Sequence, residues 1–303
     1  MNELFELHRK ELVNTINVKC TSDELMKTAI PSLSFYKTSS LSEFVSVVYE
    51  PCICLALQGS KAVGFGKELD GYNKSKYLLV STNIPANVRI EEASEKEPYI
   101  SLKISFTLEQ IYEVLKEFEG EKISKPKSKV DKGLFFGDMN MNLLNPISRL
   151  VKLLETPQKN INFMYPLIIK EILYVLLSGE SGEFLKQYVM EGSITNQIVK
   201  VISEIKNNFT ETLNVKELAE KFNMSESTLY HNFKKITMLS PIQFQKKLRL
   251  EEAKQLLLNQ KIDVNEVAFV VGYESPSQFS REYSRMFGLP PKAHINSLKE
   301  LIA

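Results

Sequence analysis

The sequence is poor in the residues that build catalytic metal centres. It has only three histidines, His8, His231 and His294, and they are far apart along the chain. An iron, manganese or zinc centre of a β-barrel enzyme needs two or three histidines and a carboxylate that converge on one ion. His8 falls on an expected terminal helix and His231 on an expected helix of the C-terminal third. The sequence therefore predicts no metal site.

Cysteine is equally scarce. Cys20, Cys52 and Cys54 are odd in number and too few for a disulfide scaffold, which fits a reducing compartment. Nothing in the sequence brings Cys52 or Cys54 near a histidine, and the sequence contains no glycine-rich phosphate loop and no serine nucleophile elbow. We therefore predict that the protein is not an enzyme and has no cofactor.

Long hydrophobic runs are missing as well. The longest one, at about residues 167–177, is interrupted by Lys170 and Glu171, and the first residues of the chain are polar and acidic, unlike a signal peptide. We expect a cytoplasmic protein without a membrane partner. The chain has 303 residues, of which 43% are hydrophobic, and this length suggests about two domains.

A strong excess of charge of one sign is also absent. The net charge is +1, with 15 Lys and Arg against 12 Asp and Glu in residues 194–303 and 23 against 25 in residues 1–193. The surplus of three positive charges in residues 194–303 is small for a nucleic-acid-binding protein. Any affinity for DNA must therefore depend on where the basic side chains lie. The basic residues concerned are Lys234, Lys235, Lys246, Lys247, Arg281, Arg285 and Lys292.

The C-terminal third contains one helix-turn-helix pattern twice. Ala219 precedes Asn223 by four residues, and Ala268 precedes Gly272 by four, so the two pairs are offset by 49 residues. A small residue lets two helices cross closely, and Asn or Gly tolerates the left-handed backbone of a turn. Beyond the turn, Ser225, Ser227, Leu229, His231, Phe233 and Pro241 match Ser275, Ser277, Phe279, Arg281, Tyr283 and Pro291 at an offset of 50.

Each copy predicts a helix with one buried face and one free face. Leu229, Phe233 and Ile236 follow the i, i+4, i+7 spacing of a buried stripe, and Ser225 and Ser275 can cap a helix or bind a phosphate. Arg, Gln and Ser on the free face can discriminate base edges in the major groove. A solvated polar face is the alternative, but the duplication, the caps and the turns together favour DNA. The predicted DNA-binding residues are Ser225, Ser227, Tyr230, His231, Lys234, Lys235, Ser275, Ser277, Gln278, Arg281 and Arg285.

These motifs resemble the DNA-binding signature of AraC/XylS transcription regulators over about residues 192–299. The resemblance is carried by residues 249–254 (RLEEAK), 267–275 (VAFVVGYES), 279–283 (FSREY) and 287–291 (FGLPP). It implies two helix-turn-helix units that enter successive major-groove turns on one side of the duplex, joined by a long helix at about residues 241–258. Leu248, Leu250, Ala253 and Leu257 are expected on the inner side of that helix. Met238 stands where the family usually has Gly, which predicts a less tightly formed C-terminal end for the second helix of the first copy.

Residues 1–135 instead predict short strands. β-rich runs occur at residues 33–38, 44–49, 52–57, 62–65, 76–81, 87–92 and 99–106, and Gly, Pro, Asn and Ser separate them. This spacing is typical of a barrel or a sandwich. Residues 58–60 predict a tight hairpin and residues 71–73 another turn. A helix is expected at residues 108–118, and the Lys-rich residues 122–129 predict an exposed connection.

The same segment resembles the small cupin-like barrel that precedes the DNA-binding domain in one AraC-type subgroup. The matching motifs are residues 49–51 (YEP), 58–61 (QGSK), 77–81 (YLLVS), 92–94 (EAS) and 98–99 (PY), together with Pro85. The resemblance implies effector sensing, dimerisation or both. A cupin enzyme is the rival interpretation, and the scarcity of histidine argues against it.

Cys52, Cys54 and Ala56 would share one face of a strand and form a surface of small side chains. This face could border a ligand cavity, or its thiols could react with an electrophile. The other interpretation is ordinary buried packing. Three expected helices follow, at about residues 140–154, 163–178 and 183–191. Their apolar stripes predict either packing on the barrel or a homodimer interface.

The sequence thus predicts an α+β protein: a cupin-like barrel with flanking helices at residues 1–135, a helical linker at 136–191, and an all-α double helix-turn-helix domain at 192–303. We expect a sequence-specific transcription regulator, more often an activator than a repressor in such a family. Its expected partners are double-stranded promoter DNA, RNA polymerase, a small-molecule effector and a second copy of the chain. A DNA-independent scaffold for partner proteins is the remaining alternative.

Overall fold

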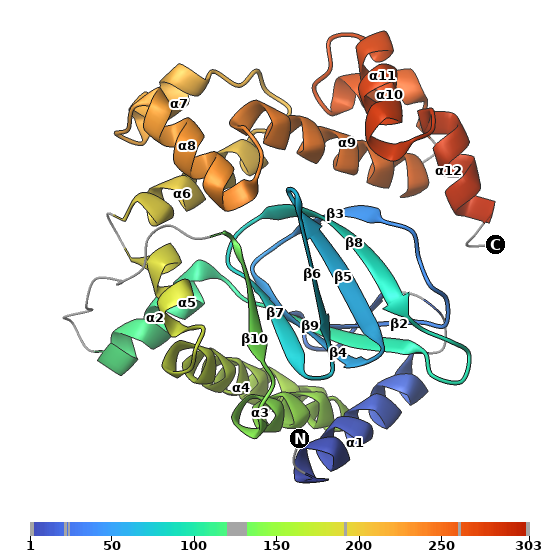
Figure 1. Ribbon diagram of the computed structural model, residues 1–303, viewed down its shortest axis with the longest axis vertical. Coiled ribbons are helices and arrows are strands. Elements are labelled where there is room, and N and C mark those ends of the chain that lie inside the picture. The colour runs from blue at the N-terminus through green and yellow to red at the C-terminus, as the bar shows by residue number, and fades with distance from the viewer. Residues whose placement is uncertain are drawn as a thin grey trace. The chain divides into compact units, whose positions relative to one another are not determined.

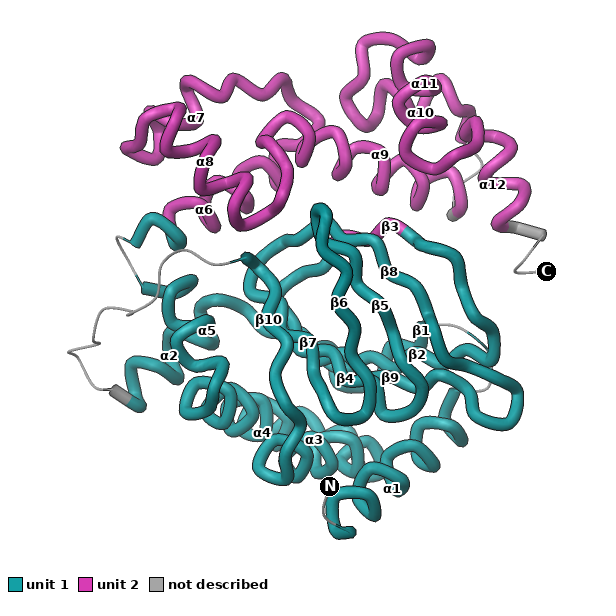
Figure 2. The backbone as a smooth tube through the Cα atoms, viewed as in Figure 1, with its two compact units in different colours: residues 1–45, 49–196 teal, residues 46–48, 197–303 magenta. Residues whose placement is uncertain are grey.

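The computed structural model describes residues 3–20, 23, 25–119, 132–190, 193–259 and 262–300. The chain forms two compact units (Figure 2): unit 1 comprises residues 1–45 and 49–196, and unit 2 comprises residues 46–48 and 197–303. The helices of the expected linker at residues 136–191 therefore pack in unit 1. The Lys-rich connection at residues 122–129 lies outside the described residues.

Unit 1 contains two β-sheets (Figure 1). The larger has the order β1-β2-β9-β4-β7-β10, and the smaller has the order β3-β8-β5-β6. The strands are β1 (Leu25–Lys27), β2 (Leu33–Thr38), β3 (Val45–Tyr49), β4 (Cys52–Gln58), β5 (Ser60–Phe65), β6 (Glu68–Asn73), β7 (Lys76–Val80), β8 (Ile84–Glu92), β9 (Tyr99–Ser105) and β10 (Leu134–Asp138). The edge strands of the two sheets do not pair with each other, so the expected barrel is in fact two open sheets.

The structure corrects two of the predicted turns. Gly59 does adopt a positive φ of 75°, but β4 and β5 on either side of it belong to different sheets, so residues 58–60 form a corner and not a hairpin. Residues 71–73 are not a turn, because they lie in β6 and pair with β5. The true β5–β6 turn contains Gly66, whose φ is 65°.

The larger sheet has an apolar face covered by helices. Ile53, Leu55 and Leu57 on this face of β4 are almost fully buried, and helix α1 (Glu3–Lys19) packs against β4. Arg9 of α1 donates a hydrogen bond of 2.6 Å to the carbonyl oxygen of Leu57, which anchors the helix to the strand. Packing continues from α1 to α3 (Met141–Lys152), and from α3 to α4 (Gln158–Ser178). The remaining elements of the unit are α2 (Leu108–Glu119), the short 3₁₀ helix Leu153–Glu155 and α5 (Gly182–Val189).

The apolar stripes of α3 and α4 are used within unit 1. Leu143, Ile147, Leu150 and Val151 of α3 and Ile168, Ile172, Leu173, Leu176 and Leu177 of α4 are all buried. These stripes therefore pack within unit 1, mainly on neighbouring helices, and a homodimer stays a prediction. Asn140 caps α3 by accepting a hydrogen bond from the Leu143 N–H.

Helix α4 also corrects the expectation about hydrophobic runs. It has 21 residues, and an 18-residue window of it has a mean hydropathy of 1.5, so by length and composition it could cross a membrane. The two charged residues in the middle of the helix are paired within unit 1, Lys170 with Glu117 and Glu171 with Arg149. These ion pairs and the buried stripe indicate that α4 is a helix packed against its neighbours in unit 1.

The described residues of unit 2 from Gln197 onward are helical, and the first helix begins three residues earlier, in unit 1. The helices of unit 2 are α6 (Ile194–Asn207), α7 (Val215–Lys221), α8 (Glu226–Thr237), α9 (Pro241–Asn259), α10 (Val264–Val270), α11 (Pro276–Phe287) and α12 (Pro291–Glu300). Helix α9 is the expected joining helix, and its inner residues Leu248, Leu250, Ala253 and Leu257 are buried as predicted. In the second half of the unit, Val267, Ala268, Phe279 and Tyr283 pack with α9 in one core.

Candidate nucleic-acid interface

The first helix-turn-helix unit consists of α7 and α8. Ala219 is 1% exposed where the two helices meet, and Asn223 takes the left-handed conformation in the turn with a φ of 53°. Ser225 caps α8, since its side chain accepts a hydrogen bond from the Thr228 N–H at 3.2 Å. The turn and cap that the sequence predicts are therefore present.

The second unit, α10 and α11, repeats this construction. Ala268 is fully buried, Gly272 has a φ of 90°, and Pro276 occupies the first turn of α11. Ser275 caps α11 by accepting a hydrogen bond from the Gln278 N–H at 3.4 Å. Both predicted serines thus cap helices, which also leaves two well-ordered helix N-termini at the surface of the unit.

Gly272 is required for a second reason besides its backbone conformation. A Cβ atom at this position would lie 2.2 Å from the carbonyl oxygen of Thr210, which belongs to the loop after α6. Arg249 of α9 fixes the same loop by donating hydrogen bonds to the carbonyl oxygens of Phe209, Thr210 and Glu211. The turn of the second unit is therefore packed against a loop that the joining helix holds in place.

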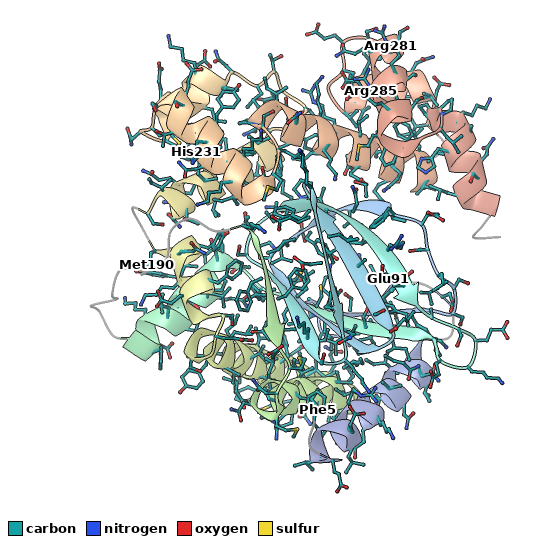
Figure 3. The ribbon with its side chains drawn as sticks, in the orientation of Figure 1. Phe5, Glu91, Met190, His231, Arg281 and Arg285 are labelled. Carbon is teal, nitrogen blue, oxygen red and sulfur yellow. The ribbon has the colours of Figure 1, made fainter. Side chains whose placement is uncertain are left out.

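The free faces of α8 and α11 are as exposed as the sequence predicts. On α8 they consist of Ser227, Tyr230, His231, Lys234 and Lys235, and on α11 of Ser277, Gln278, Arg281 and Arg285. Figure 3 marks His231 on α8 and both arginines on α11. Lys234, Lys235, Arg281 and Arg285 form no ion pair with any residue that the structure describes. Their charges are available to an external anion.

Gln278 is less free than the sequence suggests. Its side-chain amide donates a hydrogen bond to Glu282 at 3.2 Å, and Glu282 also accepts hydrogen bonds from Lys246 at 2.8 Å and from the Tyr273 hydroxyl at 2.9 Å. Burial raises the pKa of Glu282, but these hydrogen bonds outweigh it and hold the pKa below its usual value. The network joins α9, the turn and α11. Sequence reasoning missed this network, because Lys246 and Tyr273 lie 36 and 9 residues from Glu282 in the sequence.

Two of the basic residues that we counted toward DNA affinity have other roles. Lys246 pairs with Glu282, and Lys247 is half-buried on α9. Burial lowers the pKa of Lys247 to about 8, because the charged form is poorly solvated there. The basic residues left for DNA are therefore fewer than the sequence count.

Met238 ends α8 in a left-handed conformation with a φ of 61°. Its N–H donates to the Lys234 carbonyl oxygen at 2.8 Å, in the same way that Gly288, with a φ of 80°, donates to Ser284 at the end of α11. The looser exit expected for a methionine here is not what the structure has. The helix ends as tightly as its counterpart, with a non-glycine residue in a glycine conformation.

Unit 1 contains the other group of predicted site residues. Cys52, Cys54 and Ala56 do share one face of β4, and this face is turned toward the smaller sheet; all three are buried. The sulfur atoms of Cys52 and Cys54 lie 3.7 Å apart. The hydrogen bond from Cys52 and the nearby amines of Lys61 and Lys103 lower the pKa of Cys54, against the effect of burial. Sequence analysis found the thiols but not the two lysines.

Comparison with known proteins assigns both halves of the chain. Residues 29–184 match the family model for the N-terminus of AraC-type transcriptional regulators, and residues 218–297 match a helix-turn-helix domain model. The chain belongs to the AraC-type transcriptional regulators. This is a family of regulators and not of enzymes, as the sequence predicts.

Curated relatives of this AraC-type chain include operon regulators. It is 27% identical over 178 residues to the Msm operon regulatory protein of Streptococcus mutans, and 26% identical over 159 residues to the lactose operon transcription activator of Staphylococcus xylosus. These alignments cover 57% and 52% of this chain and 62% and 56% of the relatives. The chain thus spans about 60% of the length of the relatives it matches.

The fold is similar to that of ToxT from Vibrio cholerae. One ToxT crystal structure aligns with a TM-score of 0.61 at 12% sequence identity, covering 87% of this chain and 97% of ToxT. Another ToxT structure with an unsaturated fatty acid bound aligns with a TM-score of 0.58. This likeness shows a common fold of an open β-sheet unit followed by a helical helix-turn-helix unit.

Proposed function

We propose that this protein is a sequence-specific DNA-binding transcription regulator of the bacterial cytoplasm. The observation that carries the proposal is the pair of capped helices α8 and α11, each of which exposes polar side chains and two basic side chains that form no ion pair with the described residues. Such a helix fits the major groove with its N-terminal part toward the base edges. The proposal also takes support from the family to which the chain belongs.

In this proposal the residues have different tasks. Arg281, Ser277 and Gln278 on the first turns of α11 contact base edges, as Ser227, Tyr230 and His231 do on α8. Lys234, Lys235 and Arg285 lie farther along their helices and contact phosphates, which gives affinity without sequence preference. Ser225 and Ser275 hold the helix N-termini, whose N–H groups are suited to a phosphate.

A binding selection with the full-length chain tests the proposal. Purified protein is equilibrated with random duplex DNA and with fragments of its own genome, and the bound fraction is sequenced. We expect Arg281→Ala to lose about 1–3 kcal/mol of discrimination at one or two base pairs. Lys234→Ala is expected to weaken binding to all sequences alike, because a phosphate contact carries no sequence information.

Lys159→Ala is the matched control, since Lys159 is exposed on α4 in unit 1. It should leave both the affinity and the selected motif unchanged. An unaltered motif in Arg281→Ala would mean that the free face of α11 does not read bases. A protein that enriches no motif at all would contradict sequence-specific binding.

We also propose that unit 1 senses a small-molecule effector and that the DNA-bound protein contacts RNA polymerase. The support for sensing is the inner face of β4 with Cys52, Cys54 and Ala56, together with the fold shared with ToxT, one structure of which holds a fatty acid. The support for activation is a relative named as an activator. Transcription in vitro from a selected site, with and without protein, would show whether the promoter responds.

A homodimer completes the proposal, and α4 offers the surface for it. The buried stripe of α4 faces the core of unit 1, whereas Phe163, Met164 and Leu167 on the other side are 73%, 37% and 51% exposed. Large apolar side chains exposed together on one helix are typical of an interface. Light scattering of the wild-type protein and of Phe163→Glu would test it, since a charge at that position should favour the monomer.

A further inference from the structure

Glu282 of α11 is held in place by hydrogen-bond donors from three parts of unit 2. Its Oε1 atom accepts hydrogen bonds from Lys246 of α9 at 2.8 Å and from Gln278 of α11 at 3.2 Å. Its Oε2 atom accepts one at 2.9 Å from the hydroxyl of Tyr273, in the turn between α10 and α11. Tyr273 is 4% exposed and packs edge-on against the ring of Phe279. A buried side chain and an ion pair thus fix the direction of the carboxylate.

Glu282 is ionised at neutral pH. Burial would raise its pKa, but the hydrogen bonds from Lys246, Gln278 and Tyr273 keep the pKa below its usual value. An ionised carboxylate carries no proton, so it can only accept hydrogen bonds. The side-chain amide of Gln278 must therefore turn its nitrogen toward Glu282, because its carbonyl oxygen would meet a negative charge.

This contact selects one of the two orientations of the Gln278 amide. Gln278 is exposed in the first turn of α11, where its backbone N–H is bound by the cap residue Ser275. The amide nitrogen has two hydrogens, and Glu282 accepts one of them. The carbonyl oxygen and the second N–H remain for an external group. An acceptor beside a donor matches the N6 amine and the N7 atom of adenine, whereas guanine presents two acceptors at these places.

We propose that Glu282 is a positioning residue that makes Gln278 select adenine over guanine in the major groove. The inference rests on the DNA-binding function proposed above and names the base that one position of α11 recognises. Without the carboxylate, the amide can turn over and offer its N–H groups to O6 or N7 of guanine. Gln278 alone therefore does not define the base, and its pairing with Glu282 does.

Binding selections with the full-length chain and random duplex DNA test this inference. Gln278→Ala identifies the base pair concerned, because the preference should disappear only there. We expect the wild type to prefer adenine over guanine at this position by about tenfold to a hundredfold, the range of one bidentate contact. Glu282→Gln has the same shape but can donate as well as accept, so it should lose about fivefold or more of this preference while the rest of the motif stays the same.

Glu252→Gln is the matched control, since it removes one negative charge from an exposed position of α9 and should leave the motif unchanged. Modified DNA gives a second measurement that needs no variant of Glu282. Unsubstituted purine in place of the selected adenine lacks the N6 amine, and 7-deazaadenine lacks the N7 acceptor. Each should weaken wild-type binding by about threefold to tenfold and leave binding by Gln278→Ala unchanged.

Four results would overturn the inference: Gln278→Ala alters no base pair, the altered position selects a base other than adenine, both analogues bind the wild type as adenine does, or Glu282→Gln keeps the wild-type preference. The wild-type base and the analogues decide the orientation of the amide even where melting curves show that Glu282→Gln does not fold. A wild-type protein that enriches no motif refutes the regulator function itself, whereas an enriched motif with one of the four results refutes only this role of Glu282.

Discussion

Besides Asn223, three described positions in unit 2 place a residue in the left-handed conformation at a helix end or turn, and their surroundings differ. Around Gly288 a Cβ atom would meet nothing within 4 Å, whereas at Gly272 it would meet the Thr210 carbonyl oxygen at 2.2 Å. Met238 already has a Cβ in this conformation. Substitutions at these three residues can therefore separate two contributions to the free energy of unfolding: the strain of a side chain at positive φ, and the steric clash of its Cβ atom with a neighbouring atom.

We expect Gly288→Ala to destabilise the protein by about 1 kcal/mol, the cost of a side chain at positive φ. Gly272→Ala should cost more than about 2 kcal/mol, because the clash with Thr210 adds to the same backbone cost. Denaturant unfolding of the full chain, followed on the transition of unit 2, measures both. Equal losses in the two variants would show that the contact with Thr210 is unimportant.

Met238→Gly should have the opposite sign. Removal of the side chain stabilises the folded state by about 1–2 kcal/mol, because it relieves the left-handed strain. The greater freedom of glycine stabilises the unfolded chain and offsets about 0.5–1 kcal/mol of this gain. We expect a net gain of stability of up to about 1.5 kcal/mol, visible as a rise in melting temperature with unchanged DNA specificity. A fall in melting temperature would show that side-chain contacts of Met238 outweigh the strain.

At the scale of elements, the joining helix was predicted from the sequence to within one residue of α9, and the two helix-turn-helix units were placed correctly, because local signals define them. Ser225, Pro241 and Ser275 mark helix starts, and the spacing of Leu229 and Phe233 marks a buried face. Exposure of the free faces followed from the same spacing. The hydrogen bonds of Gln278 did not, since they depend on residues that the fold brings together.

Strands of unit 1 were harder to predict. β6 is polar and exposed along most of its length and contains Gly71, β1 has three residues, and β10 pairs with β7 from far along the chain. Gly59 signals a tight turn, but a local signal does not say which strands pair afterwards. That Lys103 lies on the same face of the sheet as Ser34 and Cys54 became apparent only from the strand register.

Glu282 links α9, the turn between α10 and α11, and α11, so its titration should be visible in the stability of unit 2. Its pKa in the folded protein is lowered, so its contribution to stability is complete above the usual glutamate pKa and is lost as the pH falls through the folded value. We expect the wild type to lose melting temperature more steeply below about pH 4.5 than Glu282→Gln does. Glu252→Gln, at an exposed position of α9, is the control and should keep the slope of the wild type.

At the scale of the whole molecule, one polypeptide presents two groove-reading helices. α8 and α11 flank α9, which is a single helix of 19 residues. Arg249 holds the loop before the first helix-turn-helix unit, and Lys246 pairs with Glu282 of the second. Because both restraints start from α9, the two units are held as one rigid reader.

The footprint on DNA should show this geometry. A protomer with two docked helices protects two major-groove segments about 10 base pairs apart on one side of the duplex, and a dimer doubles the pattern. Hydroxyl-radical footprinting on a selected site measures the spacing directly. Lys246→Ala removes one restraint without touching a reading face, so it should blur the second segment and reduce affinity while the first segment stays sharp. A single protected segment in the wild type would mean that one helix-turn-helix unit does not dock on the DNA. Footprints of Arg281→Ala and Lys234→Ala would then identify that unit, because only a docked helix can lose contacts with DNA.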